Sequence, residues 1–173
     1  MATVSRSRAL AAAWAMALVA SIAIVGLALT GCAATAAAPV ESVKDVGGGR
    51  STASVSYDGL TLTLNAPTSA VASAPMGVSV QLKNTSKKTV DLGGALIGVR
   101  AFTAGAEATD TVAFEAGLDA SATPAVSVPA GGTKSVALAL TAPKPGSYIL
   151  RGVFGSSIRV KGNTTPALTL TVR

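Results

Sequence analysis

The sequence predicts an all-β protein, built as an antiparallel β-sandwich of seven or eight strands. The main observation is a period of two, in which apolar residues alternate with small or polar residues along four stretches, 60–64, 78–83, 136–140 and 168–172. Such alternation places apolar side chains on one face of a strand and polar groups on the other, as in half-buried antiparallel strands. Regular turn sequences separate these stretches, and no convincing helical pattern follows residue 52.

The turn sequences define the order of the predicted strands. Asp58-Gly59 stands between a short strand ending near Tyr57 and the strand at 60–64, which is a hairpin signal. Further turns fall at 84–86, 130–132 and 144–146. Residues 103–125 are the least regular, and we expect a long loop there with a short strand around 112–115. The folded domain is therefore predicted at residues 52–173.

Residues 1–31 have the composition of an export signal. Arg6 and Arg8 precede a run from Ala9 to Leu29 in which nearly every residue is apolar. A basic start, an apolar helical centre and small residues at its end are typical of a secretory signal peptide. The alternative is an uncleaved transmembrane helix, because the run approaches the roughly 20 residues that span a bilayer. In both cases the body lies outside the membrane.

The end of this run contains the single cysteine of the chain. Leu29-Thr30-Gly31-Cys32 resembles the lipobox of bacterial lipoproteins, an apolar residue and two small residues followed by cysteine. The resemblance implies cleavage before Cys32 and attachment of a diacylglyceryl group to its thiol, with palmitate-type acyl chains. It further implies a cell-envelope protein held at the cell membrane and facing the extracytoplasmic side.

Residues 32–51 are predicted to join the anchor to the domain as a flexible linker. The segment after Cys32 is rich in alanine and contains Gly47-Gly48-Gly49, which no stable helix would continue through. A Gly-rich coil of this length has an end-to-end distance of roughly 24 Å. Such a tether would lift the domain clear of the lipid headgroups.

Two segments resemble immunoglobulin-like domains. Residues 78–92 look like the strand, Asn-x-Ser turn and strand of bacterial members of this group, and residues 129–154 resemble its later strands. Gly146-Ser147-Tyr148 is similar to the tyrosine corner, whose hydroxyl bonds to nearby backbone. The chain departs from true immunoglobulin domains, since both core cysteines and the core tryptophan are missing. Bacterial proteinase-inhibitor-like lipoprotein domains are the group it resembles most.

Composition argues against several functional classes. Without residues 1–31 the chain has twelve basic and eight acidic residues, a net charge of +4, spread along the chain. This modest excess gives nucleic-acid binding little support, and leaves weak attraction to anionic envelope polymers as the alternative to a solvated surface. The chain contains no histidine, which removes Ser-His-Asp systems and histidine metal sites. We therefore expect no cofactor and no enzymatic activity.

One acidic stretch offers candidate contacts for a ligand or partner: Glu107, Asp110, Phe114, Glu115 and Asp119. Paired carboxylates bind calcium or perform acid–base chemistry, whereas sandwich loops are often acidic because they are solvated. Phe114 is the candidate for an exposed ring, with a core position as its alternative. We expect a non-enzymatic binding role toward a protein or envelope component. The alternatives are an inhibitor or regulator of an envelope enzyme, and a hydrolase or cation carrier that uses this stretch.

Overall fold

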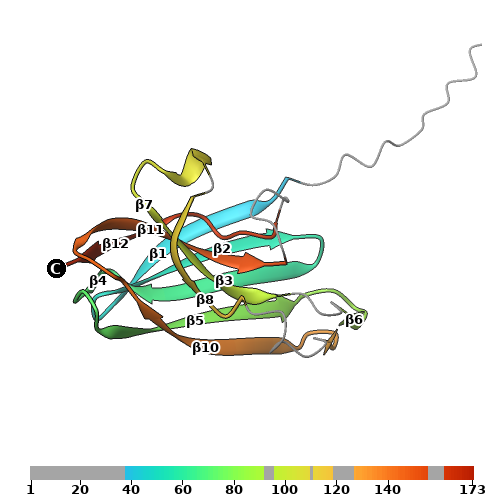
Figure 1. Cartoon of the computed structure of the whole chain (residues 1–173). Coiled ribbons are helices and arrows are strands. Elements are labelled where there is room, and N and C mark those ends of the chain that lie inside the picture. The colour runs from blue at the N-terminus through green and yellow to red at the C-terminus, as the bar shows by residue number, and fades with distance from the viewer. Residues whose placement is uncertain (1–37, 92–95, 110, 119–126, 156–161) are drawn as a thin grey trace, which may run out of the picture. The chain divides into compact units, whose positions relative to one another are not determined.

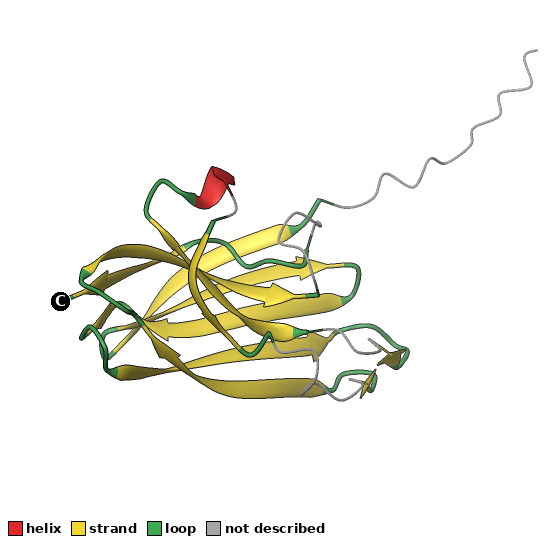
Figure 2. Cartoon of the chain, in the orientation of Figure 1, coloured by secondary structure: helices red, strands yellow, loops and turns green. Residues whose placement is uncertain are grey.

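The computed structural model describes residues 38–91, 96–109, 111–118, 127–155 and 162–173 (Figure 1). Strands account for nearly all of the regular structure, together with one short 3-10 turn, η1 (Glu107–Thr109) (Figure 2). The strands are β1 (Val40–Gly47), β2 (Arg50–Tyr57), β3 (Leu60–Pro67), β4 (Ser69–Ala70), β5 (Pro75–Asn84), β6 (Val90–Asp91), β7 (Ile97–Thr103), β8 (Val112–Ala116), β9 (Ser127–Val128), β10 (Thr133–Thr141), β11 (Gly146–Phe154) and β12 (Leu168–Val172).

Two five-stranded sheets form the sandwich. Sheet A has the order β1-β2-β3-β5-β10, and sheet B has the order β4-β12-β11-β7-β8. All pairings within them are antiparallel, apart from the short parallel pair of β4 with β12. The two-residue strands β6 and β9 pair separately. The all-β, antiparallel prediction is confirmed.

The core lies between the inward faces of the two sheets. Alternate residues of the central strands are buried, including Leu62 and Leu64 on β3, Val80 on β5, and Leu150 on β11. Each fully buried aliphatic side chain contributes roughly 1.5–3 kcal/mol relative to an exposed one. The buried hydrophobic residues form one main cluster, whose members lie between Ala53 and Val172 in the sequence, so the sandwich contains its own hydrophobic core.

The strand order is that of an immunoglobulin-like sandwich. In sheet A, β3, β5 and β10 follow the order of the immunoglobulin strands A, B and E, and in sheet B, β12, β11, β7 and β8 follow G, F, C and C′. Tyr148 lies near the start of β11, the strand equivalent to F, and its hydroxyl donates to the carbonyl of Lys144 at 3.0 Å. The hydroxyl therefore makes the backbone bond of a tyrosine corner.

We expect Tyr148→Phe to lower the free energy of unfolding by about 1 kcal/mol without changing the fold, because it removes one hydrogen bond and keeps the buried ring. Urea unfolding, monitored by circular dichroism, measures the change in the free energy of unfolding. Tyr57→Phe, the same change at a half-buried ring of β2, is the control and should shift the value by less than about 0.5 kcal/mol. Equal effects at both positions would contradict a specific role for the Tyr148 hydroxyl.

The predicted linker is wrong for residues 40–51. These residues form β1, the turn after it and the start of β2. The three glycines 47–49 all have positive φ angles, 78°, 61° and 69°, so they make a tight hairpin turn instead of a coil. The part of the linker that precedes residue 38 lies outside the described residues.

The prediction of seven or eight strands is too low. Twelve strands occur in the described ranges, three of them with only two residues. Two-residue strands are too short to show a period, and β1 has no buried face to mark it.

Two local predictions are confirmed. Asp58 and Gly59 turn between β2 and β3 with φ angles of 48° and 74°, as in a type I′ hairpin. β8 occupies the position of the predicted short strand near 112–115.

Candidate functional site

The acidic stretch does not bring its described carboxylates together. Glu107 lies in η1, whereas Glu115 lies on β8 and accepts a hydrogen bond from Nε of Arg100 at 3.2 Å. Asp110 and Asp119 fall outside the described residues. Among the residues whose placement is given, no three histidine, cysteine or acidic side chains cluster in a way that would hold a metal ion. The placed carboxylates of this stretch therefore form no joint site.

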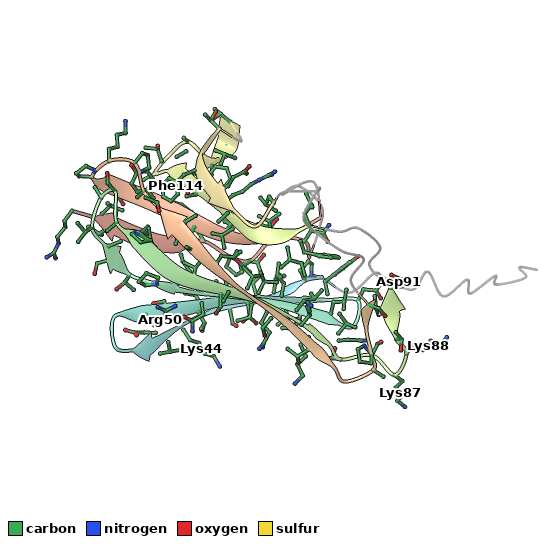
Figure 3. The ribbon with its side chains drawn as sticks, turned by 60° about the horizontal axis from the view of Figure 1, so that its bottom comes forward. Lys44, Arg50, Lys87, Lys88, Asp91 and Phe114 are labelled. Atoms are coloured by element: carbon green, nitrogen blue, oxygen red, sulfur yellow. The ribbon has the colours of Figure 1, made fainter. Side chains whose placement is uncertain are left out.

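Phe114 is a packing residue. It lies opposite Ala101 in the β7–β8 register, and Ala101 is fully buried between the sheets. The Phe114 ring meets the Tyr148 ring edge to face, with centroids 5.0 Å apart. This half-buried ring, labelled in Figure 3, packs against the main core. The structure thus favours the core alternative for Phe114 over the exposed contact.

The proposed lipidation site lies outside the described residues, as does the apolar run before it. In the described part of the chain, no helix has the length and apolar character needed to cross a bilayer. The anchoring of Cys32 therefore stays a prediction.

The feature that sequence reasoning missed is the edge strand β1. All eight of its residues are exposed, and Val40, Val43 and Val46 retain 70%, 54% and 53% of their accessible surface. Its register with β2 runs from Val40 opposite Ser56 to Gly47 opposite Arg50. β1 ends the order of sheet A, so its second side pairs with no strand of the described chain.

The opposite edge of sheet A differs. Among the described strands, β10 also pairs with β5 alone, but Leu140 is buried, and Val136 and Leu138 pack against the core. Side-chain packing therefore ties β10 to the sandwich, whereas β1 is held chiefly by backbone pairing. A long edge strand of this kind has free N–H and C=O groups that accept a further strand.

The two faces of β1 carry different charges. Glu41 and Val43 lie opposite the buried Val55 and Ala53, on the side that continues the inner face, and Asp45 follows them there by alternation. Lys44 lies opposite Thr52 on the outer side, beside Arg50 (Figure 3). The strand is thus acidic on its inner side and basic on its outer side.

The spacing of the valines explains why β1 could not be predicted from the sequence. Val40, Val43 and Val46 are three residues apart, so they fall on alternating sides of an extended strand. A strand recognised by period two needs its apolar residues two apart. The only usable signal was the glycine triplet, which fits a hairpin turn as well as a linker.

Comparisons with known proteins identify no family. No family model and no curated protein matches the chain. Among solved structures, it is similar to a CARDB domain from Pyrococcus furiosus, with 14% identity, a TM-score of 0.45, and coverage of 66% of this chain and 94% of that one. The crystal structure of that domain in complex with di-metal ions gives 12% identity, a TM-score of 0.44, and coverage of 78% and 89%.

A segment of Escherichia coli alpha-2-macroglobulin is similar at 13% identity and a TM-score of 0.46, over 72% of this chain and 8% of that protein. These likenesses are between sandwich folds and assign no activity to the chain.

Proposed function

We propose that the chain is a cell-envelope lipoprotein, anchored through Cys32, whose sandwich binds another envelope protein without catalysing a reaction. The partner strand pairs with the open side of β1 and extends sheet A. The observation that carries the proposal is the exposure of all eight residues of β1 at the end of a five-stranded sheet. Backbone hydrogen bonds supply affinity in this binding mode, and alternate side chains supply specificity.

The charges of β1 argue for a partner of different sequence. Antiparallel pairing of two copies centred on Val43 would place Glu41 opposite Asp45 twice, and like charges directly opposite each other destabilise a sheet. Pairing centred on Lys44, one residue closer to the turn, places Lys44 opposite Lys44 of the second copy. A strand with basic residues toward the inner side of β1 avoids both repulsions. An envelope enzyme as the partner would make the chain its inhibitor or regulator.

Two adjacent proline substitutions test strand addition. Successive N–H groups point to opposite sides of a strand, so one of Ser42 and Val43 directs its N–H toward β2 and the other directs it outward. Proline removes the N–H and blocks pairing on that side. We expect Ser42→Pro and Val43→Pro to differ. The outward variant, which lacks the N–H that points away from β2, should lose partner binding with little change in the free energy of unfolding. The other variant should weaken the pairing of β1 with β2.

Partner binding is read by photo-crosslinking in intact cells. A benzophenone amino acid replaces Lys44 on β1 or, as a matched control, Ala139 on the opposite edge strand β10. The expected result is a discrete adduct from position 44 that the outward proline variant reduces at least about ten-fold, a loss of roughly 1.4 kcal/mol. Equal adducts from both edges, or an adduct that survives both prolines, would contradict strand addition at β1.

A further inference from the structure

The outer face of sheet A is basic, and no carboxylate lies on it among the residues whose placement is described. Residues that alternate with the buried Leu62, Leu64, Val80 and Leu82 point away from the core, and on β2, β3, β5 and β10 these are mostly serine, threonine, alanine, asparagine and glutamine. The same face carries Lys44, Arg50 and Lys83. Glu41 and Asp45 lie on the inner side of β1, and Asp58 lies in the turn between β2 and β3 at the end of the sheet.

Several side chains of this face bond to one another across the strands. Ser54 and Thr63 share a hydrogen bond of 2.9 Å, and Ser56 and Thr61 share one of 2.8 Å. The Arg50 guanidinium lies across β3, since its Nε donates to Oδ1 of Asn65 at 2.7 Å and Nη2 donates to the Gly77 carbonyl at 3.1 Å. Arg50 therefore holds its positive charge in a fixed position among the short, hydrogen-bonded side chains of this face.

The start of β1 limits how far this face can lie from the proposed anchor. Only seven residues, 33–39, separate Cys32 from Val40, where the linker predicted from sequence had nineteen. Eight Cα-to-Cα steps span at most about 29 Å when fully extended, and about 16 Å as a flexible coil. The first residue of β1, Val40, lies opposite Ser56 on the outer face and is 70% exposed.

We infer that the outer face of sheet A lies against the anionic headgroups of the membrane to which Cys32 attaches the chain. The inference rests on the proposed anchoring. The short connection keeps the start of β1 within about 29 Å of Cys32, and a basic face without carboxylates is the one that an anionic surface attracts. Each lysine or arginine near such a surface contributes about five-fold to the binding equilibrium. A strand added to β1 continues the sheet in its own plane, so both contacts can exist together.

The test measures which face meets the bilayer. The chain from Cys32 to Arg173, labelled with 15N, is coupled through the Cys32 thiol to a maleimide lipid in nanodiscs that contain phosphatidylglycerol and a gadolinium-chelating headgroup lipid. This coupling makes the test independent of whether cells attach a lipid to Cys32. We expect broadening of the amide signals of outer-face residues such as Ser54 and Gln81, and none for Ser147 and Thr171 of sheet B.

Charge reversal supplies the matched comparison. Lys44→Glu combined with Lys83→Glu should shift the orientation equilibrium about 25-fold or more away from the face-down state. Lys134→Glu combined with Lys144→Glu makes the same change in net charge and should preserve the broadening, because Lys134 lies opposite the buried Leu82 on the inner side of β10 and Lys144 lies in the turn between β10 and β11. Higher salt should weaken the broadening in the wild type, because mobile ions screen exposed charges.

Three results would overturn the inference. Equal broadening of both sheets would show that the tethered domain has no preferred face. Unchanged broadening in phosphatidylcholine nanodiscs would show that anionic lipid is not what the face recognises. Concentration-dependent shifts of the outer-face signals without nanodiscs would assign the face to a second copy of the chain.

Discussion

Cys32→Ala is expected to abolish incorporation of a labelled palmitate analogue and to leave residues 1–31 attached to the chain. The thiol is the acceptor of the diacylglyceryl group in the lipoprotein that this segment resembles, and alanine has no group that can form the thioether. The chain has no second cysteine to take its place. Metabolic labelling, with mass spectrometry of the N-terminal peptide, measures both effects.

The strength of membrane attachment that Cys32→Ala removes follows from the burial of acyl chains in the bilayer. Each buried methylene contributes about 0.8 kcal/mol, and two chains hold a protein stably on a bilayer where one does so only marginally. Thr30→Ala is the control, because it keeps a small residue before Gly31-Cys32 and should be labelled like the wild type. A wild-type chain that begins at Met1 and carries no label would identify residues 9–29 as an uncleaved membrane helix instead.

Asn84→Ala should lower the free energy of unfolding by about 3 kcal/mol, the largest effect we expect from a polar residue of the domain. Asn84 ends β5 and is fully buried. Its Nδ2 donates to the carbonyls of Lys88, Val128 and Pro129 at 2.7, 2.9 and 3.1 Å. Its Oδ1 accepts from the backbone N–H and hydroxyl of Ser86 at 2.9 and 2.7 Å. One amide therefore joins the turn after β5 to β9.

The cost arises from the groups that alanine leaves behind. The Val128 carbonyl and the Ser86 N–H lose their bonds to the amide, and each buried polar group without a partner costs about 1–3 kcal/mol. Thermal unfolding should shift downward by about 10–15 °C. Asn65→Ala removes the same side chain from the outer face, where its Oδ1 accepts a hydrogen bond from Nε of the partly exposed Arg50, and should cost less than about 1 kcal/mol. Similar losses at both sites would contradict the special role of Asn84.

Asn84→Asp separates the acceptor role from the donor role and adds a pH dependence. The introduced carboxylate keeps the bonds from Ser86 but faces the carbonyls of Lys88 and Val128 with negative charge, so burial raises the pKa of this carboxyl above its unfolded value. The loss of stability caused by this carboxylate is absent at a pH where the carboxyl is protonated in both the folded and the unfolded chain. It grows as the pH rises through the pKa that the carboxyl has in the unfolded chain. Urea titrations should therefore show the variant closest to wild type in acid and least stable at neutral pH.

The parts of the fold that bury alternate side chains could be predicted from the sequence. Strands β3, β5 and β12 bury one face and expose hydroxyl, amide or charged groups on the other, so their period of two survives in the residue order. The Asp58-Gly59 turn is marked in the same local way, since its φ angles favour these residue types. Tyr148 was recognisable because its corner is made within four residues of chain.

The sandwich, its main strands and its tyrosine corner were thus determined by local residue order, whereas the candidate site was decided by tertiary structure. β1 is held by backbone hydrogen bonds, which nearly any side chain permits, so its residues carry no signature of pairing. Asn84 reads as an ordinary turn residue until the chain returns 44 residues later and brings Val128 to its amide. Phe114 and Glu115 are neighbours in sequence, but pleating sends one toward Tyr148 in the core and the other to Arg100 outside.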